Sequence, residues 1–318
     1  MKNFFRNPVL ESELKVKMRG WRAAMAVTAY IGIMLLIAYL YFKTILDSVL
    51  RYGGYNSASQ SIGLQVYSVL AVLQFALIIL VTPAQTAGAI SAEREKQTLD
   101  LLLCTKISSI GIIFGKLVSS LSFILLLIIG SIPLFSLVFL FGGISPGDVA
   151  TLFLFYMITA FAVGSIGIFC SAMFKKTVTA AVTAYITIFV LGIVTVILGA
   201  YMLANYYDSF AQTSTTPPPY IPSVFYLNPA IGLADLMLQQ LDGMSGGLVP
   251  SISRSIFGYS YYGGSSAATQ NTGIAFWKPW SFWIKNSLVL ISIACLLLGI
   301  SAWKIKPVHR WKRGWERK

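Results

Sequence analysis

Six long apolar stretches constrain this chain more than any other feature of its sequence. They cover residues 23–42, 64–90, 110–141, 149–174, 178–204 and 282–303. A helix needs about 20 apolar residues to cross the hydrocarbon core of a bilayer. Because lipid offers no partner to backbone N–H and C=O groups, each stretch must be helical. The sequence therefore predicts an all-α membrane protein with six transmembrane helices, in a single transmembrane domain covering residues 1–318. The third stretch is long, and Pro133 is the expected position of a bend.

Basic residues are distributed unevenly between the two sides of these spans. The chain carries 24 Lys and Arg against 11 Asp and Glu, which gives a net charge of +13. Most of the basic residues flank the span ends on the side that holds both termini. Because cytoplasmic flanks are enriched in Lys and Arg, we expect both termini to be cytoplasmic. The charge then serves topology and contact with lipid headgroups, so no nucleic acid partner is inferred.

Residues 7–22, which precede the first span, have the pattern of an amphipathic helix. Charged side chains recur on one face and apolar side chains on another, at helical spacing. The apolar face comprises Leu10, Leu14, Met18 and Trp21. A basic amphipathic helix with an aromatic residue at its boundary suits the membrane surface, so we expect an N-terminal interfacial helix in contact with lipid. The alternative is an ordinary basic flank of the first span.

Residues 205–280 form the longest stretch outside the spans, and we expect them to be extracellular. Within them, Ile221–Leu241 is interrupted by Asn228-Pro229, so it is unsuited to crossing a bilayer. It is also too apolar for a free loop. Both facts fit a re-entrant or interfacial helical hairpin before the sixth helix.

Two short segments partly match known enzyme motifs but lack other features that those motifs require. Gly243-Met-Ser-Gly-Gly247 has the letters of a nucleophile elbow, but no strand precedes it and the only histidine, His309, lies across the membrane. Gly111–Leu117 is one residue short of a phosphate-binding loop and lacks the Ser or Thr that would hold magnesium. The cysteines are scattered without paired spacing. We therefore expect no catalytic residue, metal site or cofactor in this chain.

The centres of the predicted spans carry no Lys, Arg, Asp, Glu or His. Ion-coupled carriers usually need such groups, so the energy for any transport is expected to come from another protein. Uncharged polar side chains recur along the second and fifth spans and are candidates for a translocation path. They are Tyr67, Gln74, Gln85, Thr183 and Thr187. The alternative is ordinary helix packing, with hydroxyl groups bonded to their own helix.

The loop between the second and third spans, residues 91–109, is the strongest local feature. Ser91 is placed to cap a helix, and Glu93 and Glu95 complement the dipole at its N-terminus. Alternating charges then give way to a run of leucines. This pattern predicts a short cytoplasmic helix that docks to a soluble partner, although a charge run alone also fits a solvated loop.

This segment resembles the signature of type-2 ABC exporter permeases. Those proteins carry E-R-E-x-x-T-L-x-x-L-L after the second span and G-K at the start of the third. The matching residues here are Ser91 to Leu103, Thr105, Ser108, Gly115 and Lys116. Asn7-Pro8-Val9-Leu10 and the basic helix after it resemble the interfacial elbow helix of the family. The six spans, the re-entrant segment and the cytoplasmic termini extend the resemblance over nearly the whole chain, whereas the long outer segment departs from it.

The resemblance implies a dimer of two permeases, alike or different, served by two cytoplasmic ABC ATPase subunits that bind the ATP and magnesium. It also implies that part of the loop couples the ATPase to the spans. The residues assigned to this coupling are Glu93, Arg94, Glu95, Thr98, Leu99 and Leu102. The expected location is the inner or plasma membrane of a bacterial-type cell.

A wide apolar seam between two permeases favours the export of an amphipathic or hydrophobic cargo. Examples are a peptide toxin, an antimicrobial peptide or a drug. Two other classes of function remain open at this point. One is a channel or carrier that works without nucleotide, and the other is a membrane-bound enzyme.

Overall fold

The structure of the protein is a computed structural model, which describes residues 21–52, 58–98, 109–139, 142–211, 221–240 and 281–305. Within these ranges the chain is helical and has no strand. The elements in chain order are α2 (Trp21–Tyr52), α3 (Ala58–Thr86), α4 (Ser91–Glu95), α6 (Ser109–Gly130), α7 (Ile132–Val138), α8 (Pro146–Met173), α9 (Thr177–Ala211), the 3-10 helix η1 (Ser223–Leu227), α10 (Pro229–Gln240) and α12 (Phe282–Ile305).

Among the described residues, six candidate membrane spans are each long and apolar enough to cross a bilayer, which confirms the predicted all-α architecture for this part of the chain. Several helices extend beyond the apolar stretches that predicted them. α2 continues past Phe42 to Tyr52, and α9 continues past Ala204 to Ala211. The added turns include Asp47 in α2 and Asp208 in α9. Hydropathy marks the apolar part of a helix, and the backbone hydrogen bonding continues further.

The third predicted span, residues 110–141, is divided in the structure. α6 ends at Gly130, Ser131 forms a turn, and α7 begins at Ile132. Pro133 lies in the first turn of α7, where its missing N–H costs no intrahelical hydrogen bond. The N–H of Ser131 donates to the carbonyls of Leu127 and Ile128, at 3.2 Å each. The bend expected near Pro133 is therefore a break between two helices.

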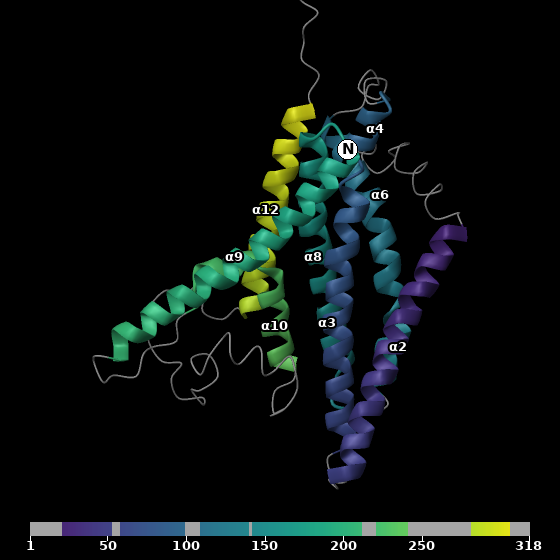
Figure 1. Ribbon diagram of the computed structural model, residues 1–318, viewed down its shortest axis with the longest axis vertical. Coiled ribbons are helices and arrows are strands. Elements are labelled where there is room, and N and C mark those ends of the chain that lie inside the picture. The colour runs from purple at the N-terminus through teal and green to yellow at the C-terminus, as the bar shows by residue number, and fades with distance from the viewer. Residues whose placement is uncertain are drawn as a thin grey trace, which may run out of the picture.

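α8 is the central helix of the bundle. In the apolar windows of the spans, 61% of α8 is buried, against 11% of α2 and 11% of α9. α3 runs beside α8, with α12 on one flank and α6 and α2 on the other (Figure 1). A capping box of Ser145 and Asp148 begins α8, with Pro146 in its first turn. Its side chains Phe155 and Tyr156 lie fully inside the core.

The two outer helices, α2 and α9, each present an open apolar face. Leu36 and Tyr39 of α2 and Phe189 and Ile197 of α9 are exposed. The C-terminal half of α9 also leans away from the other helices (Figure 1). In a bilayer such faces contact lipid tails or another membrane protein, since neither requires polar groups.

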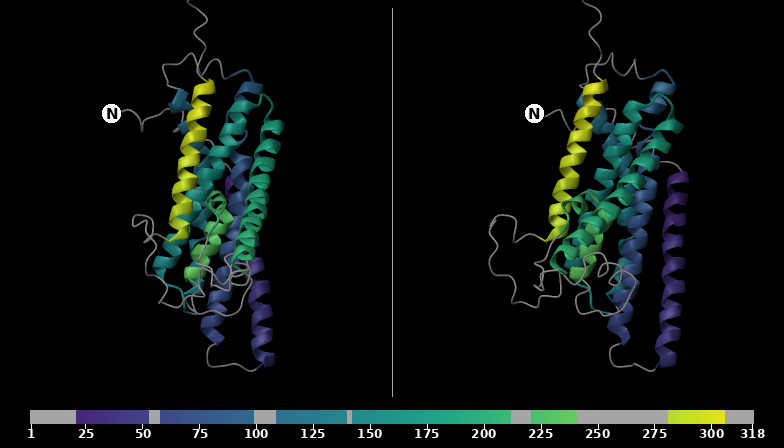
Figure 2. Two further views of the ribbon diagram at one scale, coloured as in Figure 1. Left: turned by 90° about the vertical axis from the view of Figure 1, so that its left-hand side faces the viewer. Right: turned by 60° about the vertical axis from the view of Figure 1, so that its left-hand side comes forward.

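One end of the bundle holds α4 together with the start of α6, the end of α8, the start of α9 and the end of α12 (Figure 2). We call it the α4 end. The opposite end holds α10 and the start of α12, and beyond them the lower parts of α2 and α3 project furthest (Figures 1 and 2). The two ends differ in their polar contacts, and both are described below.

The segment around Asn228-Pro229 is helical on both sides of this dipeptide, with η1 before it and α10 after it. The Nδ2 group of Asn228 donates to Thr195 Oγ1 of α9 at 2.9 Å. The Nδ2 group of Asn286 of α12 donates to the carbonyls of Tyr226 and Asn228, at 3.0 and 3.1 Å. These bonds fasten the segment to α9 and α12. Whether it enters the membrane as a re-entrant hairpin stays a prediction.

Close packing also holds η1 against α9. A Cβ atom added at Gly199 would lie 1.8 Å from a ring carbon of Phe225. Only glycine therefore lets the Phe225 ring lie on the α9 backbone at this point. The ring of Tyr226 stacks on that of Phe282 with centroids 4.7 Å apart. The α10 segment is thus part of the packed bundle.

Candidate functional site

The candidate site is α4 and the side chains that hold it at the α4 end. The chain leaves α3 at Thr86, turns through residues 87–90 and enters α4 at Ser91. The prediction that Ser91 caps this helix is wrong. Ile90 is the N-cap residue, and no side chain of the segment caps it. The Ser91 hydroxyl instead donates to the Ala87 carbonyl at 2.9 Å, because the chain is already coiled when it reaches α4.

The cap of α4 comes from another helix. Ser171 Oγ of α8 accepts hydrogen bonds from the backbone N–H groups of Ile90 and Ser91, at 2.9 Å each. Ser91 and Ser171 are both fully buried. The first N–H groups of a helix have no partner within the helix itself. Ser171, which is far from α4 in the sequence, therefore supplies the acceptor that a Ser or Asp next to a helix usually supplies.

We expect the change Ser171→Ala to loosen α4 while leaving the six spans folded. Two buried N–H groups lose their acceptor, and each unsatisfied group costs about 1–3 kcal/mol. Hydrogen exchange of the amides of Ile90 and Ser91 should accelerate by at least about tenfold. The matched control is Ser292→Ala on α12, since the exposed Ser292 hydroxyl bonds only to the Leu288 carbonyl of its own helix. Equal exchange in both variants would show that Ser171 does not hold α4.

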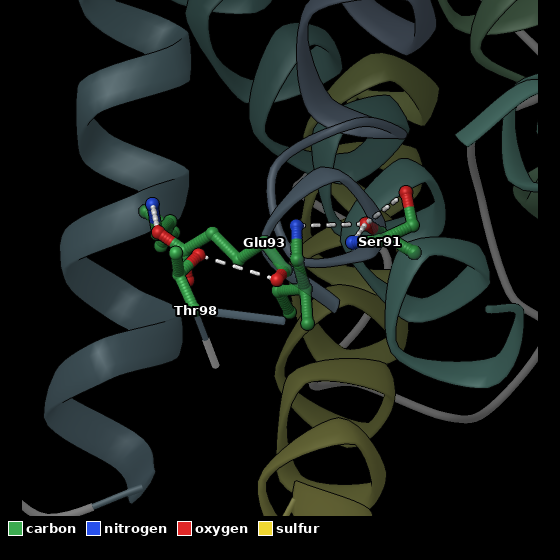
Figure 3. Close-up of polar contacts among 6 residues, drawn as sticks. Ser91, Glu93 and Thr98 are labelled. Carbon is green, nitrogen blue, oxygen red and sulfur yellow. Dashed lines mark hydrogen bonds and ion pairs between the residues drawn. The ribbon is translucent and has the colours of Figure 1, made fainter. Parts of the chain in front are cut away.

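Glu93 of α4 forms an ion pair with Lys116 of α6. The side chain of Lys116 is 8% exposed and that of Glu93 is 22% exposed. A lysine this deeply buried needs a neutralising partner, because an unpaired buried charge is costly. The two residues come from the two separate parts of the sequence signature, E-R-E and G-K, so the ion pair joins those parts in space. Figure 3 shows Glu93 between Ser91 and Thr98.

The other two charged side chains of the E-R-E sequence contact the ends of α8 and α9. Arg94 Nη1 donates to the carbonyls of Ala172 and Phe174 at the C-terminus of α8, at 3.2 and 3.4 Å. Glu95 Oε2 accepts from the Thr177 hydroxyl at 2.6 Å and from the Thr177 N–H at 3.2 Å, at the start of α9. A cation at a helix C-terminus and an anion at a helix N-terminus both match the helix dipole. α4 is therefore tied to three helices by three consecutive charges.

The C-terminal end of α4 turns sharply and faces solvent. Gln97 has φ = 59°, the left-handed conformation that often ends a helix. The Thr98 N–H donates to the Glu93 carbonyl at 2.9 Å, and the Thr98 hydroxyl donates to the same carbonyl at 3.2 Å. Lys96, Gln97 and Thr98 are all exposed. Leu99 and Leu102, which were also predicted to couple to the ATPase, lie outside the described residues.

Glu93, Arg94 and Glu95 were predicted as contacts to a partner, and each has a partner within the chain. Their coupling role stays a prediction. The residues that sequence reasoning missed at this site are the partners in space: Ser171, Thr177 and the Ala172 and Phe174 carbonyls. Lys116 was noted as part of the signature, and no acidic partner was assigned to it. A lysine within the apolar start of a span was the one available signal in the sequence that an acidic partner lies nearby.

The predicted path residues Tyr67 and Gln74 lie inside the chain. Both are fully buried. The Tyr30 hydroxyl of α2 donates to Gln74 Oε1, so the oxygen of this mid-span amide has a partner, whereas its buried Nε2 group has none among the described residues. The Tyr67 hydroxyl donates to Gln240 Oε1 of α10 at 2.6 Å. These bonds join α2, α3 and α10, and a role in translocation stays a prediction.

The remaining path candidates lie nearer the surface. Gln85 and Thr183 are half-buried, and Thr187 is exposed. The hydroxyls of Thr183 and Thr187 donate to the carbonyls of Thr179 and Thr183 in their own helix, at 2.8 and 2.7 Å. Of the predicted interfacial helix, Leu10, Leu14 and Met18 lie outside the described residues. Trp21 is the first residue of α2 and is 78% exposed.

The fold and this site define a multi-pass membrane protein in which a short helix is tied to one end of the spans. A family model described as "ABC-2 family transporter protein" matches residues 29–303. The chain therefore belongs to the ABC-2 transporter family, which confirms the resemblance found in the sequence. Permeases of this family are membrane components of transporters, are not themselves catalytic, and generally work with an ABC ATPase. Among curated proteins, none matches this chain.

Proposed function

We propose that this chain is the permease subunit of an ATP-driven exporter. Two permeases, alike or different, would work with two cytoplasmic ATPase subunits that bind ATP and magnesium. Membership of the ABC-2 family supports the transporter role and the ATPase partner. The cargo we propose is amphipathic or hydrophobic, such as a peptide toxin, an antimicrobial peptide or a drug.

The attachment of α4 is the observation that carries this proposal. The turn that follows it, residues 96–98, is exposed and accessible to a soluble partner. The charged side chains of α4 contact α6, α8 and α9. A displacement of this turn by a bound partner would therefore be transmitted through the side chains of α4 to α6, α8 and α9. We propose that α4 is the coupling helix, with Glu93, Arg94 and Glu95 as positioning residues, and that the ATPase contacts Lys96, Gln97 and Thr98.

The orientation we propose places the α4 end in the cytoplasm. Charged residues of the described helices support it, since Lys and Arg favour the cytoplasmic side. At the α4 end these are Arg94, Lys96, Lys116, Lys175, Lys176 and Lys304, against Glu93 and Glu95. At the opposite end they are Lys43 and Lys285, against Asp47, Asp148, Asp208 and Asp235. Both termini would then be cytoplasmic and α10 would lie near the outer surface of the cell membrane.

The cargo path we propose lies between two permeases and not within one. The open apolar faces of α2 and α9 support this placement, because they are the least buried of the spans. Thr187 of α9 and Gln85 of α3 would add polar groups to the path. Tyr67 and Gln74, which bond within one chain, would hold the path helices in position.

The proposed function is tested by co-purification of the detergent-solubilised chain with its neighbouring gene products. We expect an ATPase to co-purify and to hydrolyse ATP in the complex. The change Lys96→Glu should weaken ATPase binding by about tenfold, which corresponds to ~1.4 kcal/mol, because it reverses a charge at the contact. The matched control is Lys43→Glu, an exposed lysine at the opposite end, which should leave binding unchanged.

The alternative functions predict different results in the same experiment. If no nucleotide-binding protein co-purifies, the exporter proposal fails, and passive flux through reconstituted chain would then favour a channel or carrier. Equal binding by the Lys96→Glu and Lys43→Glu variants would remove α4 from the ATPase contact.

A further inference from the structure

A buried carboxyl group lies between α10 and the start of α12. Asp235 of α10 is fully buried. Its Oδ2 atom accepts from the backbone N–H of Trp283 at 3.0 Å and from Gln239 Nε2 at 2.8 Å. The first of these bonds satisfies an N–H group in the first turn of α12 that has no partner within that helix. Asp235 thus caps a membrane span from a different helix.

The seam between α10 and α12 has more acceptors than donors. Oδ1 of Asp235 is buried and has no hydrogen-bond partner among the described residues. The same holds for Oδ1 of Asn286, one helical turn beyond Trp283. The orientation of the Asn286 amide is set by its Nδ2 group, which donates to two carbonyls. Gly232, one turn before Asp235, packs so closely here that an added Cβ would lie 2.4 Å from Asn286 Oδ1. Among the described residues, the seam therefore lacks a hydrogen-bond donor for these two oxygen atoms.

We propose that Asp235 is a proton-binding site, at which a proton taken up on Oδ1 strengthens the attachment of α12 to α10. Protonation neutralises the buried carboxylate and supplies a donor to a seam with two unpartnered acceptors. No bond is broken in the chain, and the proton comes from water. The proposal concerns the folded chain itself and does not depend on the transport function.

The charged and titratable groups around Asp235 are consistent with this site. Lys285 of α12 is a cation whose charge acts on Asp235, and the Tyr226 phenol of η1 is a second titratable group that interacts electrostatically with Asp235. From α8, the Asp148 carbonyl accepts a hydrogen bond from Gln240, the last residue of α10. Burial raises the pKa of Asp235 to about 6, although the bonds from Trp283 and Gln239 and the charge of Lys285 oppose this rise. The group then titrates between mildly acidic and neutral pH.

The position of Asp235 links it to the other end of the bundle. α12 runs from the Asp235 seam to the α4 end, where Ala302 packs in one apolar cluster with Ile90 and Leu117. A change in how α12 is held at its start therefore acts on a helix that also supports α4. The pH on the α10 side would in this way bias the position of α4.

The test is the thermal stability of the purified full chain in detergent between pH 4.5 and 8, compared with the variant Asp235→Asn. The pKa in the folded state lies above the usual value of an unfolded aspartate. Stability from Asp235 is therefore largest in acid, and it falls as the pH rises toward and through about 6. We expect the unfolding midpoint of the unchanged chain to fall by a few degrees more than that of Asp235→Asn over this interval. Asn keeps an acceptor for Trp283 and also supplies a donor, like the protonated acid.

The matched control is Asp208→Asn, which alters an exposed carboxylate near the C-terminus of α9. This variant should keep the pH dependence of the unchanged chain. If Asp235→Asn does not fold, hydrogen exchange of the Trp283 amide in the unchanged chain decides the question, because it should quicken as the pH passes about 6 beyond the general base-catalysed trend of other amides. Identical pH profiles for the unchanged chain and Asp235→Asn, or no such break at Trp283, would overturn the proposal.

Discussion

Replacing Lys116 with methionine is expected to remove the ion pair between α4 and α6. ATP hydrolysis by the complex of this chain with its ATPase should then fall by about tenfold or more. The methionine keeps the apolar length of the side chain and removes its charge. Glu93 then remains partly buried without its cation. Removing one partner of a buried ion pair costs about 3–5 kcal/mol. Because Glu93 is 22% exposed, we expect solvent to reduce this to about 1–3 kcal/mol.

Two comparisons separate loss of this ion pair from a general effect of lost charge. Lys175→Met removes an exposed lysine at the same end of the bundle and should leave coupling unchanged. The double change Glu93→Lys with Lys116→Glu restores opposite charges in exchanged positions, and it should recover part of the activity lost in either single variant. The measurement is ATP hydrolysis by the purified complex, with hydrogen exchange of α4 as the structural readout. A double variant no better than the single ones would contradict the role of this pair.

The same variants distinguish two explanations of the charged side chains of α4. If Glu93 contacts the ATPase directly, then Lys116→Met leaves that contact available and affects binding little. If Glu93 instead holds α4 in place, Lys116→Met and Glu93→Gln should have similar effects on coupling. The geometry favours the second explanation, because the Glu93 carboxylate is directed to Lys116 of α6.

The six spans were predictable because the signal for them is local. A run of apolar residues in lipid can only be helical, whatever its neighbours are. The division of the third span near Pro133 was also local, since proline lacks the N–H that a continuous helix needs. The added turns of α2 and α9 were missed because polar residues such as Asp47 and Asp208 continue a helix as readily as apolar ones once it has started.

The contacts at the α4 end could not be predicted, because they join residues far apart in the chain. Ser171 is 81 positions from Ile90, and nothing near either residue indicates their bond. Gln74 illustrates the partial case. A mid-span amide required some partner, and that requirement was read correctly from the sequence, whereas its identity as Tyr30 depended on how α2 packs on α3.

Replacing Gly167 with alanine is expected to destabilise the chain more than any other change of one methyl group in α8. Gly167 lies where α8 crosses the end of α3. An added Cβ would lie 1.9 Å from Thr86 Oγ1, 2.9 Å from Thr86 Cβ and 3.3 Å from the Ala87 backbone nitrogen. The Thr86 side chain is fully buried, and its hydroxyl bonds to the Thr82 carbonyl. Relief therefore requires α3 and α8 to separate, and overpacking of this kind costs about 1–3 kcal/mol or more.

Separation of α3 and α8 at Gly167 should also weaken the attachment of α4. Ser171 is one helical turn further along α8, and it caps α4 directly after the end of α3. We therefore expect Gly167→Ala to lower the unfolding midpoint and to quicken hydrogen exchange of the Ile90 and Ser91 amides. The control is Gly299→Ala on α12, where an added Cβ meets nothing within 4 Å. That change should be neutral or stabilising, since alanine favours a helix over glycine by about 1 kcal/mol.

A second-site change tests whether the Thr86 contact is the cause. Adding Thr86→Ala to Gly167→Ala removes the hydroxyl that lies 1.9 Å from the new Cβ, and it leaves the 2.9 Å contact with the Cβ of residue 86. We therefore expect a partial recovery of the unfolding midpoint, and a fuller one with Thr86→Gly, which removes both contacts. Recovery that follows this order would show that the contact between α3 and α8 determines the position of α4. A Gly167→Ala variant as stable as Gly299→Ala would instead mean that the two helices are free to shift at this crossing.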